Sequence, residues 1–239
     1  MDQSRGTLVA VEGASAAGKT TAIAAAALAT GWTVVSEAYR RLRPVPSLEF
    51  RSPTDLLRLE RKLLDEDARR YSEARRRTES GATVLADTGF FGPLTYSWGL
   101  VAAGAASPSV LRSLVDRART LADRGKWGLA DLYIYLDAPP AVRAARARSD
   151  PLGHPPLLAA RHEKVGVTER RFYLERFAPL LGRRFRRLSG ADRAARVAER
   201  VVDTVGEAPG PAANQGSIEA VLALFTPGEP APRPARGNR

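Results

Sequence analysis

The sequence contains no cysteine, and its only imidazole groups belong to His154 and His162. Disulfides, thiolate nucleophiles and cysteine-based zinc sites are therefore excluded, and a reducing compartment suits the chain. No apolar run approaches the roughly 18 residues that a membrane-spanning helix needs. We expect a cytoplasmic protein that does not use the membrane as a partner.

Asparagine and glutamine are also scarce, since neither occurs between Gln3 and Asn214. A carboxamide side chain reads a nucleobase edge well because it offers a hydrogen-bond donor beside an acceptor. Recognition of a base by this chain would therefore have to come from arginine, from hydroxyl groups or from the backbone.

Positive charge is in excess, because 37 lysines and arginines stand against 26 acidic residues and give a net charge of +11. Such an excess suits a nucleic-acid binder, a protein that handles polyphosphates, or an ordinary basic surface. The arginine cluster at 75–77 contains no aromatic side chain on which a base could stack, and the cluster at 183–187 contains only Phe185. We therefore do not expect nucleic acid to be a partner.

Short β-branched segments alternate with helix-favouring segments along the chain, and this alternation predicts an α/β fold with a parallel sheet covered on both faces. The longest expected helix begins with the N-cap Ser52 and with Pro53 in the first helical position. The expected strands cover 7–12, 33–36, 83–86, 132–136 and 185–188, and the expected helices cover 19–29, 53–80, 93–103, 108–122, 139–148, 157–177 and 191–205.

The composition predicts one domain followed by a tail. We expect the domain over 1–206, with a lid near 143–158, and a tail rich in proline, alanine and glycine over 207–239. The apolar stretch at 217–225 inside this tail predicts a short helix. We interpret it as a helix that packs on the domain, and a partner-binding motif is the alternative.

The segment from Gly13 to Thr20 is the part of the sequence that indicates a chemical function most specifically. Its residues, GASAAGKT, satisfy the pattern G-x-x-x-x-G-K-[ST]. The glycines let backbone N–H groups turn inward around a phosphate, Lys19 neutralises the β- and γ-phosphates, and the Thr20 hydroxyl binds Mg²⁺. This loop predicts ATP and Mg²⁺ as cofactors. The residues expected to bind the nucleotide are Gly13, Ser15, Ala16, Ala17, Gly18, Lys19, Thr20 and Thr21.

Three classes of protein use such a loop: kinases, regulatory GTPases, and ATPases that act as motors or switches. The guanine-binding pattern N/T-K-x-D is absent, because no lysine has an aspartate two residues later. Motor ATPases commonly follow the aspartate that ends a strand with a glutamate, whereas here Thr88 follows Asp87. A kinase is therefore the first interpretation, and an ATP-dependent switch that binds nucleic acid or protein is the alternative from another class.

The candidate catalytic residues besides Lys19 are Glu37, Asp87, Arg146 and Arg148. Glu37 and Asp87 end two strands at the edge where open α/β sheets bind ligands. Glu37 is the candidate base for the acceptor hydroxyl, and Asp87 joins Thr20 as a metal residue. The arginines would carry positive charge to the transferred group. The alternatives are a surface pair of Glu37 with Arg40 and an ordinary basic helix face.

These motifs resemble the thymidylate kinase and deoxynucleoside kinase group of P-loop kinases. LVAVEGASAAGKTT is similar to the group's strand and phosphate loop, VVSEAYR to the segment with its catalytic glutamate, and DLYIYLDAPPAVRAARAR to its strand, turn and lid helix. The resemblance covers about 5–205. It implies a P-loop kinase three-layer sandwich with a five-stranded parallel sheet in the order 2-3-1-4-5, and often a homodimer.

The sequence indicates the acceptor less directly than it indicates the nucleotide. Thr88 replaces the arginine that follows the aspartate in the group, so a usual partner of the acceptor's phosphate is missing. We expect the γ-phosphoryl group of ATP to pass to a hydroxyl or a phosphate of a small molecule. A nucleoside or nucleotide is the favoured acceptor, and a natural product or antibiotic is the alternative. Core packing is the alternative role for the aromatic members of the substrate-binding set, which comprises Tyr39, Arg40, Phe91 and Tyr96.

Overall fold

The computed structural model describes residues 5–47, 49–149, 156–208 and 217–226. Its five strands form one sheet in the order β2-β3-β1-β4-β5, and every neighbouring pair is parallel. This confirms the predicted fold class and strand order. The strands are β1 (Leu8–Glu12), β2 (Thr33–Val35), β3 (Val84–Asp87), β4 (Leu132–Asp137) and β5 (Phe185–Ser189).

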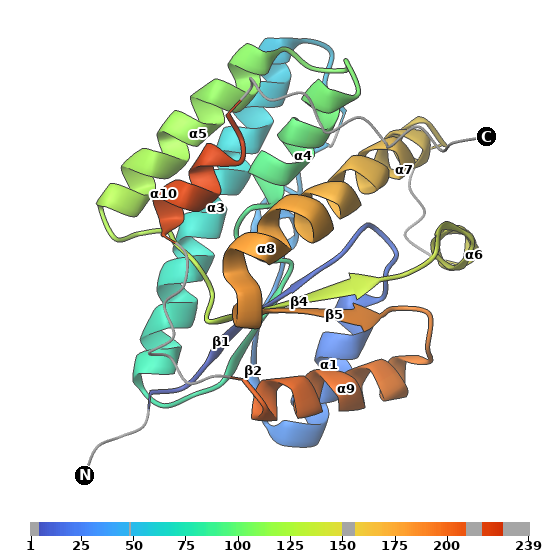
Figure 1. Ribbon diagram of the computed structural model, residues 1–239. Coiled ribbons are helices and arrows are strands. Elements are labelled where there is room, and N and C mark those ends of the chain that lie inside the picture. Colours follow the sequence, from blue (N-terminus) through green and yellow to red (C-terminus); the bar gives the residue numbers. More distant parts are fainter. Residues whose placement is uncertain (1–4, 48, 150–155, 209–216, 227–239) are drawn as a thin grey trace, which may run out of the picture.

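Successive side chains of the buried strands point to opposite faces of the sheet, where they form two separate hydrophobic cores. Val9 and Val11 of β1 face α1 (Lys19–Thr30) and α9 (Ala194–Gly206), whereas Leu8 and Ala10 face the opposite side. Figure 1 shows α1 and α9 below the sheet and the other large helices above it. The chain is therefore a three-layer sandwich, as expected for parallel strands that are buried on both faces.

The upper layer consists of α3 (Pro53–Glu79), α4 (Gly92–Ala102), α5 (Pro108–Asp123) and α7 (Pro156–Arg171). The predicted cap of α3 is present, because the Ser52 hydroxyl accepts a hydrogen bond of 3.1 Å from the backbone N–H of Asp55. Among the described residues, no helix is both long and apolar enough to cross a lipid bilayer.

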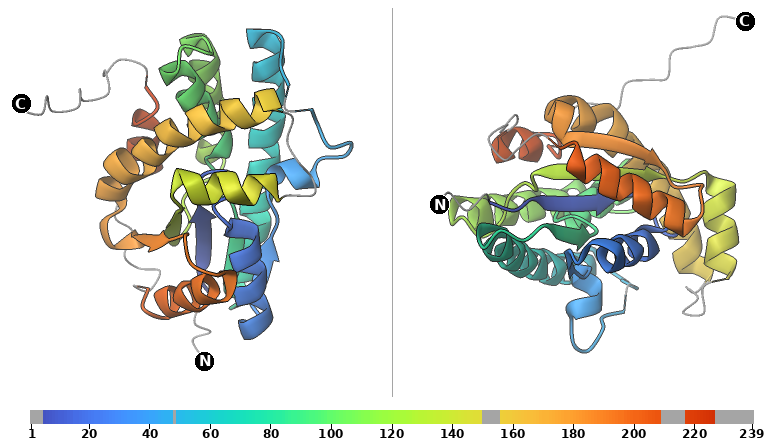
Figure 2. Two further views of the ribbon diagram at one scale, coloured as in Figure 1. Left: turned by 90° about the vertical axis from the view of Figure 1, so that its right-hand side faces the viewer. Right: turned by 90° about the horizontal axis from the view of Figure 1, so that it is seen from below.

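Two further helices lie at the carboxyl ends of the strands. They are α2 (Ala38–Arg41), which follows β2, and α6 (Pro140–Arg148), which follows β4. The left view of Figure 2 faces this edge and shows α6 and α7 side by side across it. These two helices flank the middle of the predicted lid, 150–155, which lies outside the described residues.

The expected helix at 157–177 is not α-helical throughout. It changes at its end to the π-helix η1 (Phe172–Phe177), before α8 (Ala178–Leu181) and the 3₁₀ turn η2 (Gly182–Arg184). At 3.6 residues per turn, five residues advance about 140° around an α-helix, which would turn Phe177 away from Phe172. The π-helical spacing brings them together, and their rings stack with centroids 5.9 Å apart.

An aromatic cluster in the upper core also includes Phe91, whose side chain is fully buried. Its ring packs edge-on against Trp127 at 4.7 Å and Phe177 at 5.6 Å. The prediction that Phe91 binds the substrate is therefore wrong, because neighbouring rings surround it on the side of the core.

The short helix α10 (Ile218–Ala223) packs beside α5 at the outer end of this cluster (Figure 1). Its Ser217 cap accepts a hydrogen bond of 3.1 Å from the backbone N–H of Ala220. The Phe225 ring is fully buried and stacks on Phe172 with centroids 4.6 Å apart. The helix thus covers apolar surface of the domain.

Candidate active site

The phosphate loop joins β1 to α1 through backbone conformations that residues other than glycine rarely adopt. Gly13 has a φ of 141° and Gly18 a φ of 97°, and a Cβ atom on Gly13 would lie only 2.6 Å from the Leu136 carbonyl oxygen. Lys19 Nζ donates hydrogen bonds to the carbonyl oxygens of Gly13 at 2.6 Å and Ala14 at 3.2 Å. Its ammonium group therefore lies over the loop, where phosphate oxygens can replace these weak partners.

The two residues predicted to hold a metal ion lie together. The Thr20 hydroxyl donates a hydrogen bond of 2.8 Å to Asp87 Oδ2, although 67 positions separate these residues in the sequence. Asp87 Oδ1 is buried and has no hydrogen-bond partner in the described part of the chain. A hydroxyl beside a carboxylate with a free oxygen is a donor set that suits Mg²⁺.

The protein supplies only a few ligands for such an ion. The described residues contain no cluster of three or more histidine, aspartate or glutamate side chains arranged to bind a metal. Mg²⁺ usually keeps several waters and binds through one or two carboxylates together with substrate phosphates. Thr20 and Asp87 therefore fit Mg²⁺ that arrives with a nucleotide.

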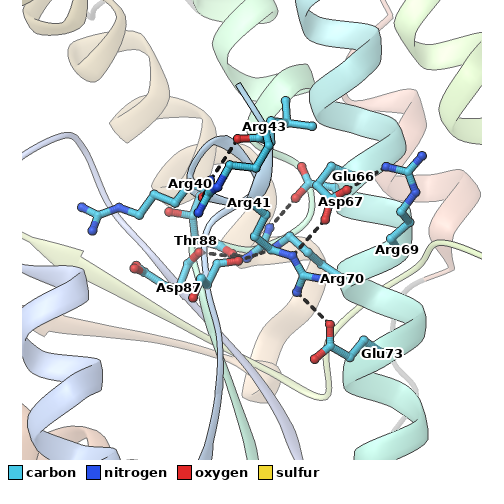
Figure 3. Close-up of polar contacts among 12 residues, drawn as sticks. Arg40, Arg41, Arg43, Glu66, Asp67, Arg69, Arg70, Glu73, Asp87 and Thr88 are labelled. Carbon is cyan, nitrogen blue, oxygen red and sulfur yellow. Dashed lines mark hydrogen bonds and ion pairs between the residues drawn. The ribbon is translucent and has the colours of Figure 1, made fainter. Parts of the chain in front are cut away.

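Arg70 holds the strand ends that carry these groups, and Figure 3 shows its side chain directed from α3 toward Asp87 and Thr88. The guanidinium is fully buried and pairs with the buried carboxylate of Asp67. Its other donors reach the carbonyl oxygens of Ser36 (2.6 Å), Thr88 (2.7 Å), Asp87 (2.9 Å) and Gly89 (3.2 Å).

These contacts occupy all five N–H donors of Arg70, so it has none left for a ligand. They also fix an unusual backbone, because Thr88 has a φ of 62°, which is costly for a β-branched residue. Sequence reasoning missed Arg70, since its position in α3 gives no sign that it reaches two strand ends.

The candidate base Glu37 follows β2 and precedes α2. Its carboxylate lies 3.9 Å from Arg40 Nε, and both side chains are more than one-third exposed, so the attraction between them is weak. Glu37 is nevertheless close enough to Asp67 and Glu169 to contribute to the raised pKa of each. Tyr39, beside it, is half-buried. Glu37 thus lies within electrostatic range of these two buried carboxyl groups.

The lid arginines have different positions. Arg146 donates to the carbonyl oxygens of Ala17 and Gly190, both at 2.8 Å, and so supports the phosphate loop from outside. Arg148 is exposed and makes no hydrogen bond or ion pair with the described residues.

Arg143, which we did not select as a catalytic residue, lies nearer the loop. A Cβ atom on Gly166 of α7 would be 3.2 Å from its Nη1 atom and 3.4 Å from Ala14 Cβ, so all three lie close together. Arg143 also lowers the pKa of Glu169 by its charge, although burial raises that pKa to about 7. The spacing of the arginines in the sequence does not reveal which of them turns inward.

Glu12 is a third group that our site prediction omitted. It is almost fully buried at the end of β1, and burial followed by repulsion from Glu169 raises its pKa to about 7. A Cβ atom on Gly89 would lie 2.0 Å from Glu12 Oε1, so only glycine fits opposite this carboxyl group. An acidic residue that directly follows four apolar strand residues is the signal that could have identified it.

The aromatic members of the predicted substrate-binding set differ in their burial. Tyr96 is half-buried on α4, and the Arg161 guanidinium lies 4.3 Å from the centre of the Phe50 ring. Phe91 does not contribute, since it lies in the core. An open hollow of about 520 Å³, lined by residues that include Tyr71, Arg75 and Asp131, lies at the amino ends of the strands and is separate from this site.

Comparison with known proteins shows the family to which the chain belongs. No curated protein sequence matches the chain. A deoxyadenosine kinase from M. mycoides with bound dATP matches the structure with a TM-score of 0.67 and 13% identity, covering 83% of this chain and 99% of that one. The same enzyme with dCMP and a flexible dCDP matches with a TM-score of 0.62 and 13% identity, covering 83% and 98%.

At this identity the likeness shows the fold, which is that of the deoxynucleoside kinases and agrees with the resemblance seen in the sequence. A family model described as "AAA domain" matches residues 8–152, which include the phosphate loop and Asp87. Because this match spans more than half of the sequence, the chain belongs to that family of P-loop proteins.

Proposed function

We propose that the chain is an ATP-dependent kinase that transfers the γ-phosphoryl group to a hydroxyl of a small molecule. The hydrogen bond between Thr20 and Asp87 carries the proposal, because it joins the phosphate loop to the strand end beside the candidate base Glu37. Catalysis by such a site consists of positioning and charge stabilisation, and the required groups come from the segments that follow β1, β2, β3 and β4.

In the proposed reaction, the acceptor oxygen forms a bond to the γ-phosphorus while the bond from that phosphorus to the oxygen bridging it to the β-phosphorus breaks. The acceptor proton passes to Glu37, and ADP leaves. Lys19 binds the phosphates and Arg143 adds charge from the lid, while Arg70 keeps Asp87 in place. When bound, Mg²⁺ would supply charge neutralisation between the phosphates, with Thr20 and Asp87 as its protein ligands.

A nucleoside is the first acceptor to test, since the matched deoxyadenosine kinase structures contain dATP, dCMP and dCDP. A natural product or antibiotic is the alternative. The substrate-binding candidates that remain are Tyr39, Arg40 and Tyr96, because Phe91 is buried in the core. We further propose one domain over 1–206 with a lid near 143–158, followed by a tail over 207–239. We also propose that the chain assembles as a homodimer.

An ATP-dependent switch that binds nucleic acid is less well supported. Arg75 forms two hydrogen bonds with Asp131, at 2.9 and 2.8 Å, and Arg184 is buried against the Ala130 and Asp131 carbonyl oxygens. Arg187 pairs with Asp137. Members of both arginine clusters are thus engaged inside the domain, which reduces the charge available to a phosphate backbone.

Release of ADP tests the proposal. We expect ADP formation from ATP and Mg²⁺ to be slow without an acceptor and to increase at least tenfold with the right acceptor, because water is a poor substitute for a positioned hydroxyl. Acceptor-independent ATP hydrolysis that increases only with DNA or RNA, and that declines steeply with salt, would support the switch instead.

A further inference from the structure

The candidate base Glu37 lies between two attachments of its segment to α3. On the amino-terminal side, Arg70 Nε donates a hydrogen bond of 2.6 Å to the carbonyl oxygen of Ser36, the residue directly before Glu37. On the carboxyl-terminal side, Arg41 is the last residue of α2, and its side chain pairs with two carboxylates of α3 (Figure 3). Because both attachments lead to α3, this helix determines where the backbone around Glu37 lies.

Arg41 contacts two turns of α3 at once. Its Nε atom lies 2.9 Å from Glu66 Oε1, and its Nη1 atom donates a hydrogen bond of 2.7 Å to Glu73 Oε2. These glutamates are about two helical turns apart, so their side chains lie on the same face of α3. A guanidinium group presents its donors as a rigid fork and can therefore bind both carboxylates. The Glu66 side chain is only 8% exposed, so water screens this ion pair less than it screens a surface pair.

The helix α2 depends on such an attachment because it is very short. It is a single turn of four residues, in which the N–H group of Arg40 donates a hydrogen bond of 3.1 Å to the Glu37 carbonyl oxygen. Helices shorter than about 12 residues are marginal by themselves, because a few hydrogen bonds do not offset the cost of nucleation. Glu37 is the N-cap residue of α2, although none of the described N–H groups of this helix is capped by its carboxylate. The helix thus fixes the backbone of Glu37 without using its carboxylate.

The two carboxylates that bind Arg41 each have a second partner on α3 itself. Arg69 lies 2.8 Å from Glu66, and Arg77 lies 3.1 Å from Glu73. Replacement of Arg41 by a neutral residue therefore leaves neither carboxylate without a cation. The large destabilisation that follows when a buried charge loses its partner is not expected here, so the fold should survive the loss of Arg41.

We infer that Arg41 is a positioning residue of the proposed kinase, which keeps the Glu37 carboxylate within reach of the acceptor hydroxyl by fixing α2 to α3. The inference rests on the function proposed above. The charged group of Arg41 is bound to α3, so it acts on the reaction through Glu37. A general base must lie within hydrogen-bond reach of the proton that it takes, and a displacement of about 1 Å can lower a rate by about 10²-fold.

The test is a double-mutant cycle between Arg41 and Glu37. Labelled phosphoryl transfer from [γ-³²P]ATP is measured for wild type, Arg41→Gln, Glu37→Gln and the double variant. The acceptor is whichever member of a panel of nucleosides and hydroxylated natural products the wild type phosphorylates fastest. Arg69→Gln is the matched control, because Arg69 pairs with the same Glu66 carboxylate from within α3. Arg41→Lys is the conservative variant, since an ammonium group keeps the charge but lacks the fork that binds two carboxylates.

We expect Arg41→Gln to lower kcat by about tenfold and to leave the Kd of ATP, measured by calorimetry, as in wild type. In the Glu37→Gln background the same substitution should change kcat by less than about twofold, because the base that Arg41 positions is already lost. The kcat of Arg41→Lys should lie between those of wild type and Arg41→Gln, and Arg69→Gln should behave as wild type. A thermal melt establishes that each variant is folded, and if Arg41→Gln is not, Arg41→Lys takes its place in the cycle.

The possible failures have different meanings. A wild-type kcat in Arg41→Gln would overturn the inference and leave the kinase intact. So would a loss of kcat that is equally large in the Glu37→Gln background, because Arg41 would then act on the fold rather than through Glu37. Binding of ATP by wild type with no transfer to any acceptor would overturn the proposed function and the inference together.

Discussion

Thr20 and Asp87, which lie at the ends of different structural elements, are joined by a hydrogen bond of 2.8 Å. This contact brings the phosphate loop and the end of β3 to a single point, and the second oxygen of Asp87 remains without a partner within the described residues.

Asp87→Asn should raise the Mg²⁺ concentration needed for half-maximal activity by about tenfold or more, because an amide is a weaker ligand than a carboxylate. A Mg²⁺ titration of ADP formation measures the change. Asp137→Asn is a matched control, since Asp137 also ends a strand at this edge but pairs outward with Arg170 at 2.8 Å. An equal Mg²⁺ requirement in wild type and Asp87→Asn would remove Asp87 from the metal site.

Glu37→Gln should lower kcat by roughly 10²-fold, because the amide cannot accept the acceptor's proton. ATP affinity, measured by calorimetry, should remain as in wild type, since Glu37 lies on the acceptor side. If kcat is unchanged, the base has been assigned wrongly, and Asp87 becomes the next candidate.

Arg70→Leu should destabilise the fold by about 3–5 kcal/mol, because it leaves the buried Asp67 carboxylate without its cation. Urea denaturation of the nucleotide-free protein measures the loss. Arg69→Leu is the control on the same helix, since Arg69 is exposed and pairs with Glu66, and its loss should be within about 1 kcal/mol. Equal losses for the two variants would refute the role of Arg70 in holding the strand ends.

Stability should fall as pH rises from about 5 to 8. The pKa values of Glu12, Asp67 and Glu169 are each raised to about 7 in the folded protein, whereas unfolded carboxyl groups titrate near pH 4. The folded state therefore holds protons that the unfolded state has lost, and this advantage disappears as those groups ionise.

Urea midpoints at several pH values measure this dependence, and Glu169→Gln should make it shallower. Asp137 acts in the opposite sense below about pH 4, because its hydrogen bonds with Arg170 lower its pKa. A midpoint that rises steadily from pH 5 to pH 8 would contradict the assigned burial of these carboxyl groups.

The sequence predicted the features that depend on local signals. The G-x-x-x-x-G-K-[ST] spacing, the Ser52 cap with Pro53, and the acidic ends of the strands all led to observed elements, whereas the strand order followed from the resemblance to the deoxynucleoside kinase group. These signals are local because a turn, a cap or a buried strand is determined within a few residues.

The features that depend on distant contacts could not be predicted. Nothing near Phe91 indicates that Trp127 and Phe177 enclose its ring, and the π-helical end of the expected helix depends on packing between Phe172 and Phe177. Glu60 looks like any polar residue of an amphipathic helix until the structure shows that its side chain is buried. Burial of a polar group is a property of the assembled layers, so only the fold reveals it.

Kinase activity is tested by transfer of the labelled γ-phosphoryl group from ATP to an acceptor, compared between wild type and Lys19→Ala. We expect label in a small-molecule acceptor with wild type alone, while both proteins show the same thermal melt. Label that wild type releases only as inorganic phosphate, with every hydroxyl-bearing acceptor unlabelled, would contradict the proposed kinase activity.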